Sequence, residues 1–215
     1  PRMLEDMGFR VIVPATPWGE SIEKRSACLN DALRDCEGPL HLIGHSMGGL
    51  DARHFITHHA GHEKVASLTT ISTPHHGSFI AEHAMRTPYS PWRHIPAVAD
   101  LNYAAMQNFN RGTPDMPGII YRSYSAARPL TEQPWAGRPF GRSLSAQEGA
   151  NDTLVSIASA QWGEHIATLK ADHFELIGSN IWLNPLRKRA PFPHLDLYRD
   201  IGRWILGYGK QGRDS

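Results

Sequence analysis

The sequence lacks the features that mark disulfide-rich, nucleic-acid-binding and membrane-spanning proteins. Cys28 and Cys36 are its two cysteines, which are too few for a disulfide framework and lack the paired spacing of a zinc site. Neither sign of charge is in excess, because 22 Lys and Arg face 21 Asp and Glu. No run approaches the roughly 20 apolar residues that cross a bilayer. We therefore expect no nucleic-acid partner, no transmembrane segment and no global field that attracts an anionic surface.

The chain opens without an initiator methionine and without a signal segment. It begins Pro1-Arg2 and runs directly into helix-like sequence, whereas a secretory signal would show a basic stretch and then an apolar one. We expect that upstream residues are missing, so the sequence does not indicate a compartment. Its 215 residues fit one domain with a core of its own.

Apolar strands and amphipathic helices alternate along the chain. This alternation is typical of a parallel sheet with helices on both faces, and it predicts an α/β fold. Ser21 is the expected N-cap of the first long helix. The expected strands are residues 9–13, 40–43, 65–71, 119–124 and 166–169, and the expected later helices are 47–59 and 195–206.

A proline-punctuated aromatic segment interrupts this pattern between residues 79 and 118. Long segments of this kind are usually functional loops, so we predict an inserted cap that covers the site with a mobile apolar surface. A second polar stretch rich in Gly and Pro runs over residues 128–150. The apolar residues of the predicted cap are Tyr89, Trp92, Tyr103, Met106 and Phe109.

Residues 44–48 read Gly-His-Ser-Met-Gly where a strand meets a helix, which is the setting of a nucleophile elbow. The turn holds Ser46 in strained backbone angles, and the flanking glycines allow helix and strand to approach closely. We predict that Ser46 is a nucleophile. The backbone N–H of Met47, at the helix N-terminus, is the predicted donor to an oxyanion.

A serine hydroxyl needs a histidine to take its proton and a carboxylate to orient that histidine. In elbow enzymes the chain order is serine, acid, histidine, which leaves His165, His173 and His194 as candidates for the base. We prefer His173, in a polar turn after the last strand, with His194 as the runner-up. For the acid we prefer Asp152, because Asp172 is too close to His173 in sequence to orient it easily.

Four motifs occur in order along the chain: Gly-His-Ser-Met-Gly-Gly-Leu-Asp (44–51), Ile-Ser-Thr-Pro-His-His-Gly-Ser (71–78), Asn-Asp-Thr-Leu-Val (151–155) and Asp-His-Phe (172–174). Together they resemble the α/β-hydrolase lipases, with the closest likeness to fungal triacylglycerol lipase-like proteins and a more distant one to bacterial true lipases. The resemblance implies a single α/β-hydrolase domain over residues 1–215 with Ser46, Asp152 and His173 as catalytic triad.

The sequence departs from that family at its start. Relatives carry an upstream strand ending in His-Gly, whose loop supplies the second oxyanion donor, and no such strand precedes Pro1. Bacterial relatives also place a calcium carboxylate two residues after the catalytic histidine, where Glu175 stands here. With no convincing partner for a calcium ion, we interpret Glu175 as a solvated loop residue and expect neither metal nor cofactor.

These features predict hydrolysis of carboxylic esters through an acyl-serine. The resemblance and the apolar cap favour long-chain glycerides as substrates, with transient contact to a lipid surface. One alternative is a broad carboxylesterase or lipid acyl hydrolase. Another, suggested by the absent His-Gly strand, is a catalytically weak hydrolase fold that serves as a lipid-binding module.

Overall fold

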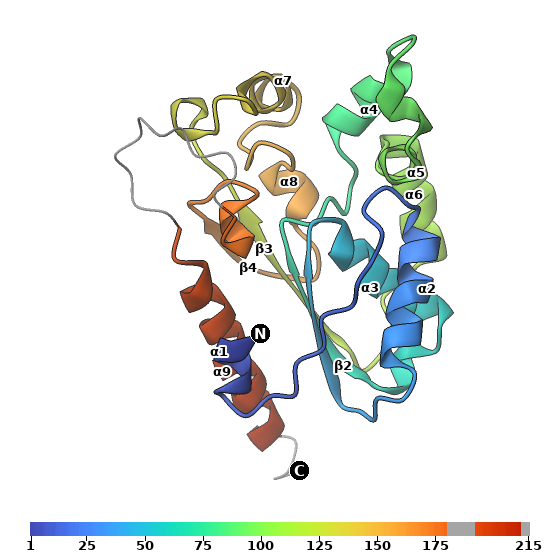
Figure 1. The fold of residues 1–215 in the computed structure, drawn as a ribbon, viewed down its shortest axis with the longest axis vertical. Coiled ribbons are helices and arrows are strands. Elements are labelled where there is room, and N and C mark those ends of the chain that lie inside the picture. The colour runs from blue at the N-terminus through green and yellow to red at the C-terminus, as the bar shows by residue number, and fades with distance from the viewer. Residues whose placement is uncertain (180–191, 212–215) are drawn as a thin grey trace.

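A four-stranded sheet, entirely parallel, forms the centre of the computed structural model, which describes residues 1–179 and 192–211. Its strands are β1 (Leu40–His45), β2 (Val65–Ile71), β3 (Ile120–Ala126) and β4 (Glu164–Leu169), in the order β1-β2-β3-β4. Because all three pairings are parallel, the carboxyl ends of the strands lie at one edge of the sheet (Figure 1). The connections between strands must return across its faces.

Helices supply these connections and cover both faces. The bounds are α1 (Arg2–Glu5), α2 (Ile22–Leu33), α3 (Met47–His58), α4 (Phe79–Arg86), α5 (Pro96–Asp100), α6 (Tyr103–Gly112), α7 (Arg138–Glu148), α8 (Ile157–Ala160) and α9 (His194–Gln211), with short 3₁₀ turns η1 (Gly61–Glu63), η2 (Pro91–His94), η3 (Leu130–Glu132) and η4 (Glu175–Ile177). Among the described helices, none is both long enough and apolar enough to span a membrane.

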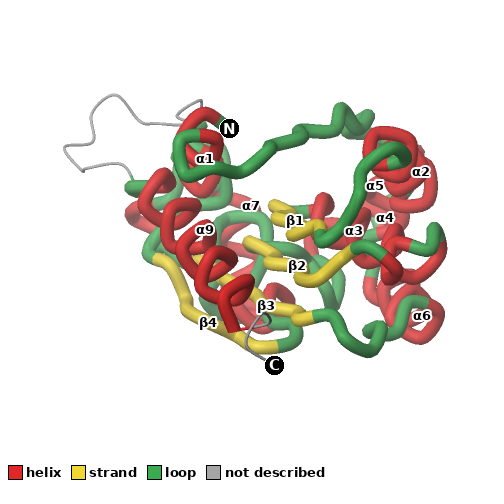
Figure 2. Tube along the Cα trace, turned by 90° about the horizontal axis from the view of Figure 1, so that it is seen from below, coloured by secondary structure: helices red, strands yellow, loops and turns green. Residues whose placement is uncertain are grey.

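Figure 2 shows α9 on one face of the sheet and α2 and α3 on the other, and an apolar core lies between the sheet and the helices on each face. On one face, Phe55 of α3 and Leu29 of α2 pack with Leu68 of β2. On the other face, Ile201 of α9 packs with Ile71 of β2. A buried ion pair also joins the two helices of the first face, since Arg25 Nη2 of α2 lies 2.7 Å from Asp51 Oδ2 of α3. Burial raises the pKa of Asp51 to about 6, although Arg25 acts in the opposite direction.

The expected strand at residues 9–13 is wrong. These residues form an irregular segment in which Val13 is 72% exposed, and Figure 2 shows this loop passing β1 without joining the sheet. Its β-branched residues favour extended backbone, but a strand also needs a neighbour for its N–H and C=O groups. Within the described residues, β1 pairs with β2 alone and lies at an edge of the sheet.

The segment 79–118 divides into an outer and an inner part. Tyr89 and Trp92, near η2, are 97% and 55% exposed, whereas Met106 of α6 is fully buried against Leu50 of α3. Met106 in the α6 half is therefore ordinary core, whereas the outer part of the segment carries the exposed aromatic side chains. The polar stretch at residues 128–150 includes α7, whose Leu144 is buried.

The join between β1 and α3 is the tightest backbone contact near the predicted elbow. A Cβ atom on Gly44 would lie 2.6 Å from the Cα and the N of Gly49, and a Cβ on Gly49 would lie 2.2 Å from Thr73 Oγ1. Gly48, by contrast, has open space around it. The close approach therefore requires Gly44 and Gly49, whereas Gly48 belongs to the motif but takes no part in this contact.

We predict that Gly44→Ala lowers the thermal unfolding midpoint by about 4 °C or more, because backbone atoms must move to admit the methyl group. The matched control is Gly48→Ala, which adds the same group to a helical position with room for it and should be neutral or slightly stabilising. Thermal unfolding followed by circular dichroism measures both. Equal losses in the two variants would show that the close approach is not the constraint.

Candidate active site

Ser46 lies between the last residue of β1 and the first residue of α3, in the strained conformation that an elbow requires. Its φ is 54° and its ψ is −132°, a region that residues other than glycine rarely occupy. Two hydrogen bonds hold the turn: Ser46 N–H donates to the carbonyl of Ile71 at 3.0 Å, and Gly49 N–H donates to the carbonyl of Ser46 at 3.1 Å. Met47 begins α3, so its N–H is among those that the helix leaves without an internal acceptor.

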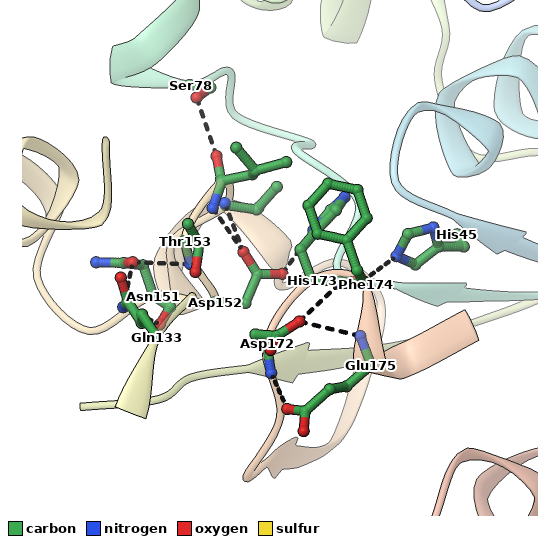
Figure 3. Close-up of polar contacts among 12 residues, drawn as sticks. His45, Ser78, Gln133, Asn151, Asp152, Thr153, Asp172, His173, Phe174 and Glu175 are labelled. Atoms are coloured by element: carbon green, nitrogen blue, oxygen red, sulfur yellow. Dashed lines mark hydrogen bonds and ion pairs between the residues drawn. The ribbon is translucent and has the colours of Figure 1, made fainter. Parts of the chain in front are cut away.

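The structure brings Asp152 and His173 together (Figure 3). His173 Nδ1 lies 2.7 Å from Asp152 Oδ2, and both side chains are almost completely buried. Asp152 Oδ1 accepts hydrogen bonds from the backbone N–H groups of Leu154 at 3.0 Å and Val155 at 2.8 Å. Burial alone would raise the pKa of Asp152, but His173 and these N–H groups lower it further than burial raises it. The carboxyl group is therefore an anion at neutral pH.

His45 connects this pair to the elbow. Its Nε2 lies 3.0 Å from the backbone carbonyl of His173, and the two imidazole rings are 4.5 Å apart. Because His45 directly precedes Ser46, the contact holds His173 beside the turn. The described contacts do not include a hydrogen bond between Ser46 and His173, and such bonds are often long in unliganded enzymes and tighten on substrate binding.

Neighbouring segments hold the loop that carries Asp152. Asn151 Oδ1 accepts a hydrogen bond from Gln133 Nε2 at 3.0 Å, and Ser78 Oγ donates to the carbonyl of Leu154 at 3.2 Å (Figure 3). Ser78 ends the motif at residues 71–78, so two of the motifs recognised in the sequence meet here. Thr153 has a φ of 99°, and these contacts hold the loop in its strained conformation.

The turn that carries His173 is stabilised by charge. Asp172 Oδ1 accepts the backbone N–H groups of Phe174 and Glu175, each at 3.0 Å. Glu175 in turn accepts the N–H of Asp172 at 2.8 Å and forms an ion pair with Arg128 at 3.1 Å, with both side chains buried. The interpretation of Glu175 as a solvated residue is therefore wrong, because its carboxylate is a buried partner of Arg128. The described residues contain no group of three His, Cys, Asp or Glu side chains placed to hold a metal ion.

The other two histidine candidates lie away from Asp152. His165 is the second residue of β4, near the amino end of the strand, where its ring contacts Ser123 and Ser125. His194 begins α9 and its ring lies against Gly178, where an added Cβ would be 2.4 Å from Nε2. Sequence reasoning missed the contacts of His45 and Arg128. The place of His45 next to Ser46 was a usable signal, whereas nothing local marks Arg128.

Solved structures share this arrangement of strands and helices. A metagenomic carboxyl esterase superposes with a TM-score of 0.81 at 19% identity, covering 96% of this chain and 68% of that one. The lipase of Staphylococcus hyicus superposes with a TM-score of 0.75 at 16% identity, covering 98% of this chain and 88% of that one. The chain has the α/β-hydrolase fold.

Sequence comparison relates this chain to a yeast lipase and confirms the resemblance that its motifs indicated. It is 34% identical to triacylglycerol lipase 2 of Saccharomyces cerevisiae over 208 residues, which is 86% of this chain. Residues 28–108 also match the family described as PGAP1-like alpha/beta domain. The chain spans 62% of the length of the yeast protein.

We predict that Asp152→Asn lowers the free energy of unfolding at pH 7 and that this loss disappears in acid. The fold lowers the pKa of Asp152 below its ordinary value of 3.8, so the anion stabilises the folded state above the unfolded-state pKa. That contribution is lost as pH falls through the lower folded-state pKa, below about pH 4. Urea unfolding of both proteins from neutral to acidic pH measures the difference. The exposed Asp35→Asn is the control and should stay within about 0.5 kcal/mol of wild type throughout. A loss for Asp152→Asn that is the same at every pH would contradict the ionic explanation.

Proposed function

We propose that this α/β hydrolase cleaves carboxylic esters through an acyl-Ser46 intermediate and that its substrates are triacylglycerols. The observation that carries the proposal is the Asp152–His173 pair, with Nδ1 and Oδ2 at 2.7 Å, held by His45 beside the elbow that presents Ser46. A strained serine next to an oriented histidine is the arrangement that acyl transfer needs. The relationship to a yeast triacylglycerol lipase supports the choice of substrate.

In the proposed reaction, Ser46 Oγ attacks the ester carbonyl while His173 Nε2 takes the hydroxyl proton. Asp152 holds the proton of Nδ1, which fixes the tautomer and stabilises the imidazolium that forms. The carbonyl oxygen becomes an anion that Met47 N–H stabilises. His173 then returns its proton to the departing alcohol, which leaves the acyl-serine. A water molecule then attacks the acyl carbon while His173 takes one of its protons. His173 returns that proton to Ser46 Oγ as the bond between the acyl carbon and Oγ breaks, which releases the carboxylic acid and restores Ser46.

The surface around the carboxyl ends of the strands suits an apolar substrate. Figure 1 shows α4 and α7 at this end of the molecule, and four large exposed side chains belong to these regions. They are Tyr89 and Trp92 after α4, and Trp135 and Phe140 at the start of α7, each between 48% and 97% exposed. Exposed aromatic groups on segments at one end of the molecule favour contact with a partner surface over bulk water. We propose that these four residues make transient contact with a lipid surface.

Ser46→Ala should abolish both ester hydrolysis and covalent labelling by a fluorophosphonate probe, because the probe reacts with an activated serine. Asp152→Asn should reduce kcat by about 10⁴-fold, because the amide favours the wrong imidazole tautomer. His194→Ala serves as the control and should keep both activities, since His194 lies against Gly178. Gel fluorescence and release of fatty acid measure the outcomes. Persistent labelling of Ser46→Ala, or loss of labelling in His194→Ala, would reject the assignment.

Substrate class is tested by comparing emulsified triolein with a short soluble ester. We expect faster hydrolysis of triolein. The double variant Trp92→Ser/Trp135→Ser should lower only the triolein rate, by about tenfold, because exposed indole rings lose their contact with the lipid surface. Leu206→Ser, an exposed apolar position on α9, is the matched control and should change neither rate. Faster turnover of the short ester would favour a broad carboxylesterase, and a folded protein without hydrolysis would favour a lipid-binding module.

A further inference from the structure

His173 is held by hydrogen bonds at three of its four polar atoms. Its backbone N–H donates to the carbonyl of Asp152 at 2.9 Å, and its Nδ1 contacts the Asp152 carboxylate at 2.7 Å. Its backbone carbonyl accepts from His45 Nε2 at 3.0 Å. The fourth atom, Nε2, has no hydrogen bond within the described part of the chain. It is the atom that would exchange a proton with Ser46 in the proposed reaction.

The bond from His45 differs from the other two in where it originates. Asp152 and its loop follow β3, whereas His45 is the last residue of β1 and the covalent neighbour of Ser46. The Asp152 contacts therefore orient the imidazole without fixing its distance from the nucleophile. The His45 contact fixes that distance, because it joins the backbone of His173 to the strand that ends in the elbow.

His45 is suited to this task because it donates a hydrogen bond without carrying charge. Burial, together with the neighbouring His173, lowers the pKa of His45 to about 3, and the opposing effect of Asp152 is smaller. The neutral ring has one N–H, and since Nε2 faces a carbonyl oxygen that can only accept, this proton lies on Nε2. A charged donor 4.5 Å from the ring of His173 would oppose the imidazolium that forms during acyl transfer.

We propose that His45 is a positioning residue that sets the distance between His173 and Ser46 through its hydrogen bond to the His173 backbone carbonyl. This inference rests on the proposed function. It gives a role in the reaction to the residue between Gly44 and Ser46, a position that can vary in the Gly-x-Ser-x-Gly motif. Its consequence is that a neutral side chain that donates a hydrogen bond at the same place can replace histidine, whereas an apolar one of similar size cannot.

The test compares His45→Gln, whose amide can reach the position of Nε2, with His45→Phe, which fills similar space and donates nothing. We expect His45→Gln to keep kcat within about threefold of wild type. We expect His45→Phe to lose about 10²-fold in kcat with KM unchanged, the size of effect that a displacement of about 1 Å can cause. The rate of fluorophosphonate labelling of Ser46 should fall in parallel.

Two further measurements separate positioning from a structural role. The downfield proton resonance of His173 Nδ1–H should persist in His45→Phe, since the bond to Asp152 is intact. The thermal unfolding midpoint of His45→Phe should stay above the assay temperature, so that unfolding does not explain the loss of kcat. If His45→Phe does not fold, His45→Met takes its place, and His45→Gln still decides. A folded His45→Gln that loses more than tenfold in kcat overturns the inference, as does a non-donor variant with wild-type kcat. Failure of the proposed function is recognised separately, as hydrolysis or labelling that survives Ser46→Ala.

Discussion

The close approach of β1 and α3 is the constraint on which the rest of the candidate site depends. Because Gly44 and Gly49 leave no room for a Cβ atom, the chain turns from strand to helix within a single residue, and that residue, Ser46, takes a positive φ. The same turn aims the N-terminal N–H groups of α3 at the space beside Ser46. It also directs His45, the last residue of the strand, toward the loop of His173. One backbone contact thus places a nucleophile, an oxyanion donor and a contact to the proposed base.

Buried charge in the loops around this turn is balanced by specific partners. Asp152 has the ring of His173 and two backbone N–H groups, and Glu175 has Arg128. Charges taken out of water are costly unless such partners are supplied, so breaking either pair would disfavour the folded arrangement of its loop. The two loops are also joined directly, through the backbone N–H of His173 and the carbonyl of Asp152. These polar contacts therefore fix the loops of the acid and the base relative to each other.

The segment between β2 and β3 combines two functions that its composition does not separate. Met106 completes an apolar core with Leu50 of α3, which anchors α6 to the sheet domain. Tyr89 and Trp92 lie on the solvent side of the same segment. An anchored inner part allows the outer part to carry exposed aromatic side chains without loss of the fold, because Met106 of the inner part supplies the apolar burial.

The sequence by itself determined where β1 to β4 lie along the chain and that an elbow forms at Ser46, and it nominated Asp152 and His173. Each of these depends on a local pattern: apolar periodicity, glycine placement or a short motif. It did not determine the fate of residues 9–13, since a strand depends on a neighbour that may come from anywhere in the chain. Nor did it determine that Glu175 pairs with Arg128 or that His45 contacts the carbonyl of His173. Arg128 and Glu175 are 47 positions apart in the chain, and His45 and His173 are 128 positions apart. Only the tertiary structure decides these contacts, because burial and hydrogen-bond geometry arise when the loops at the carboxyl ends of the strands come together.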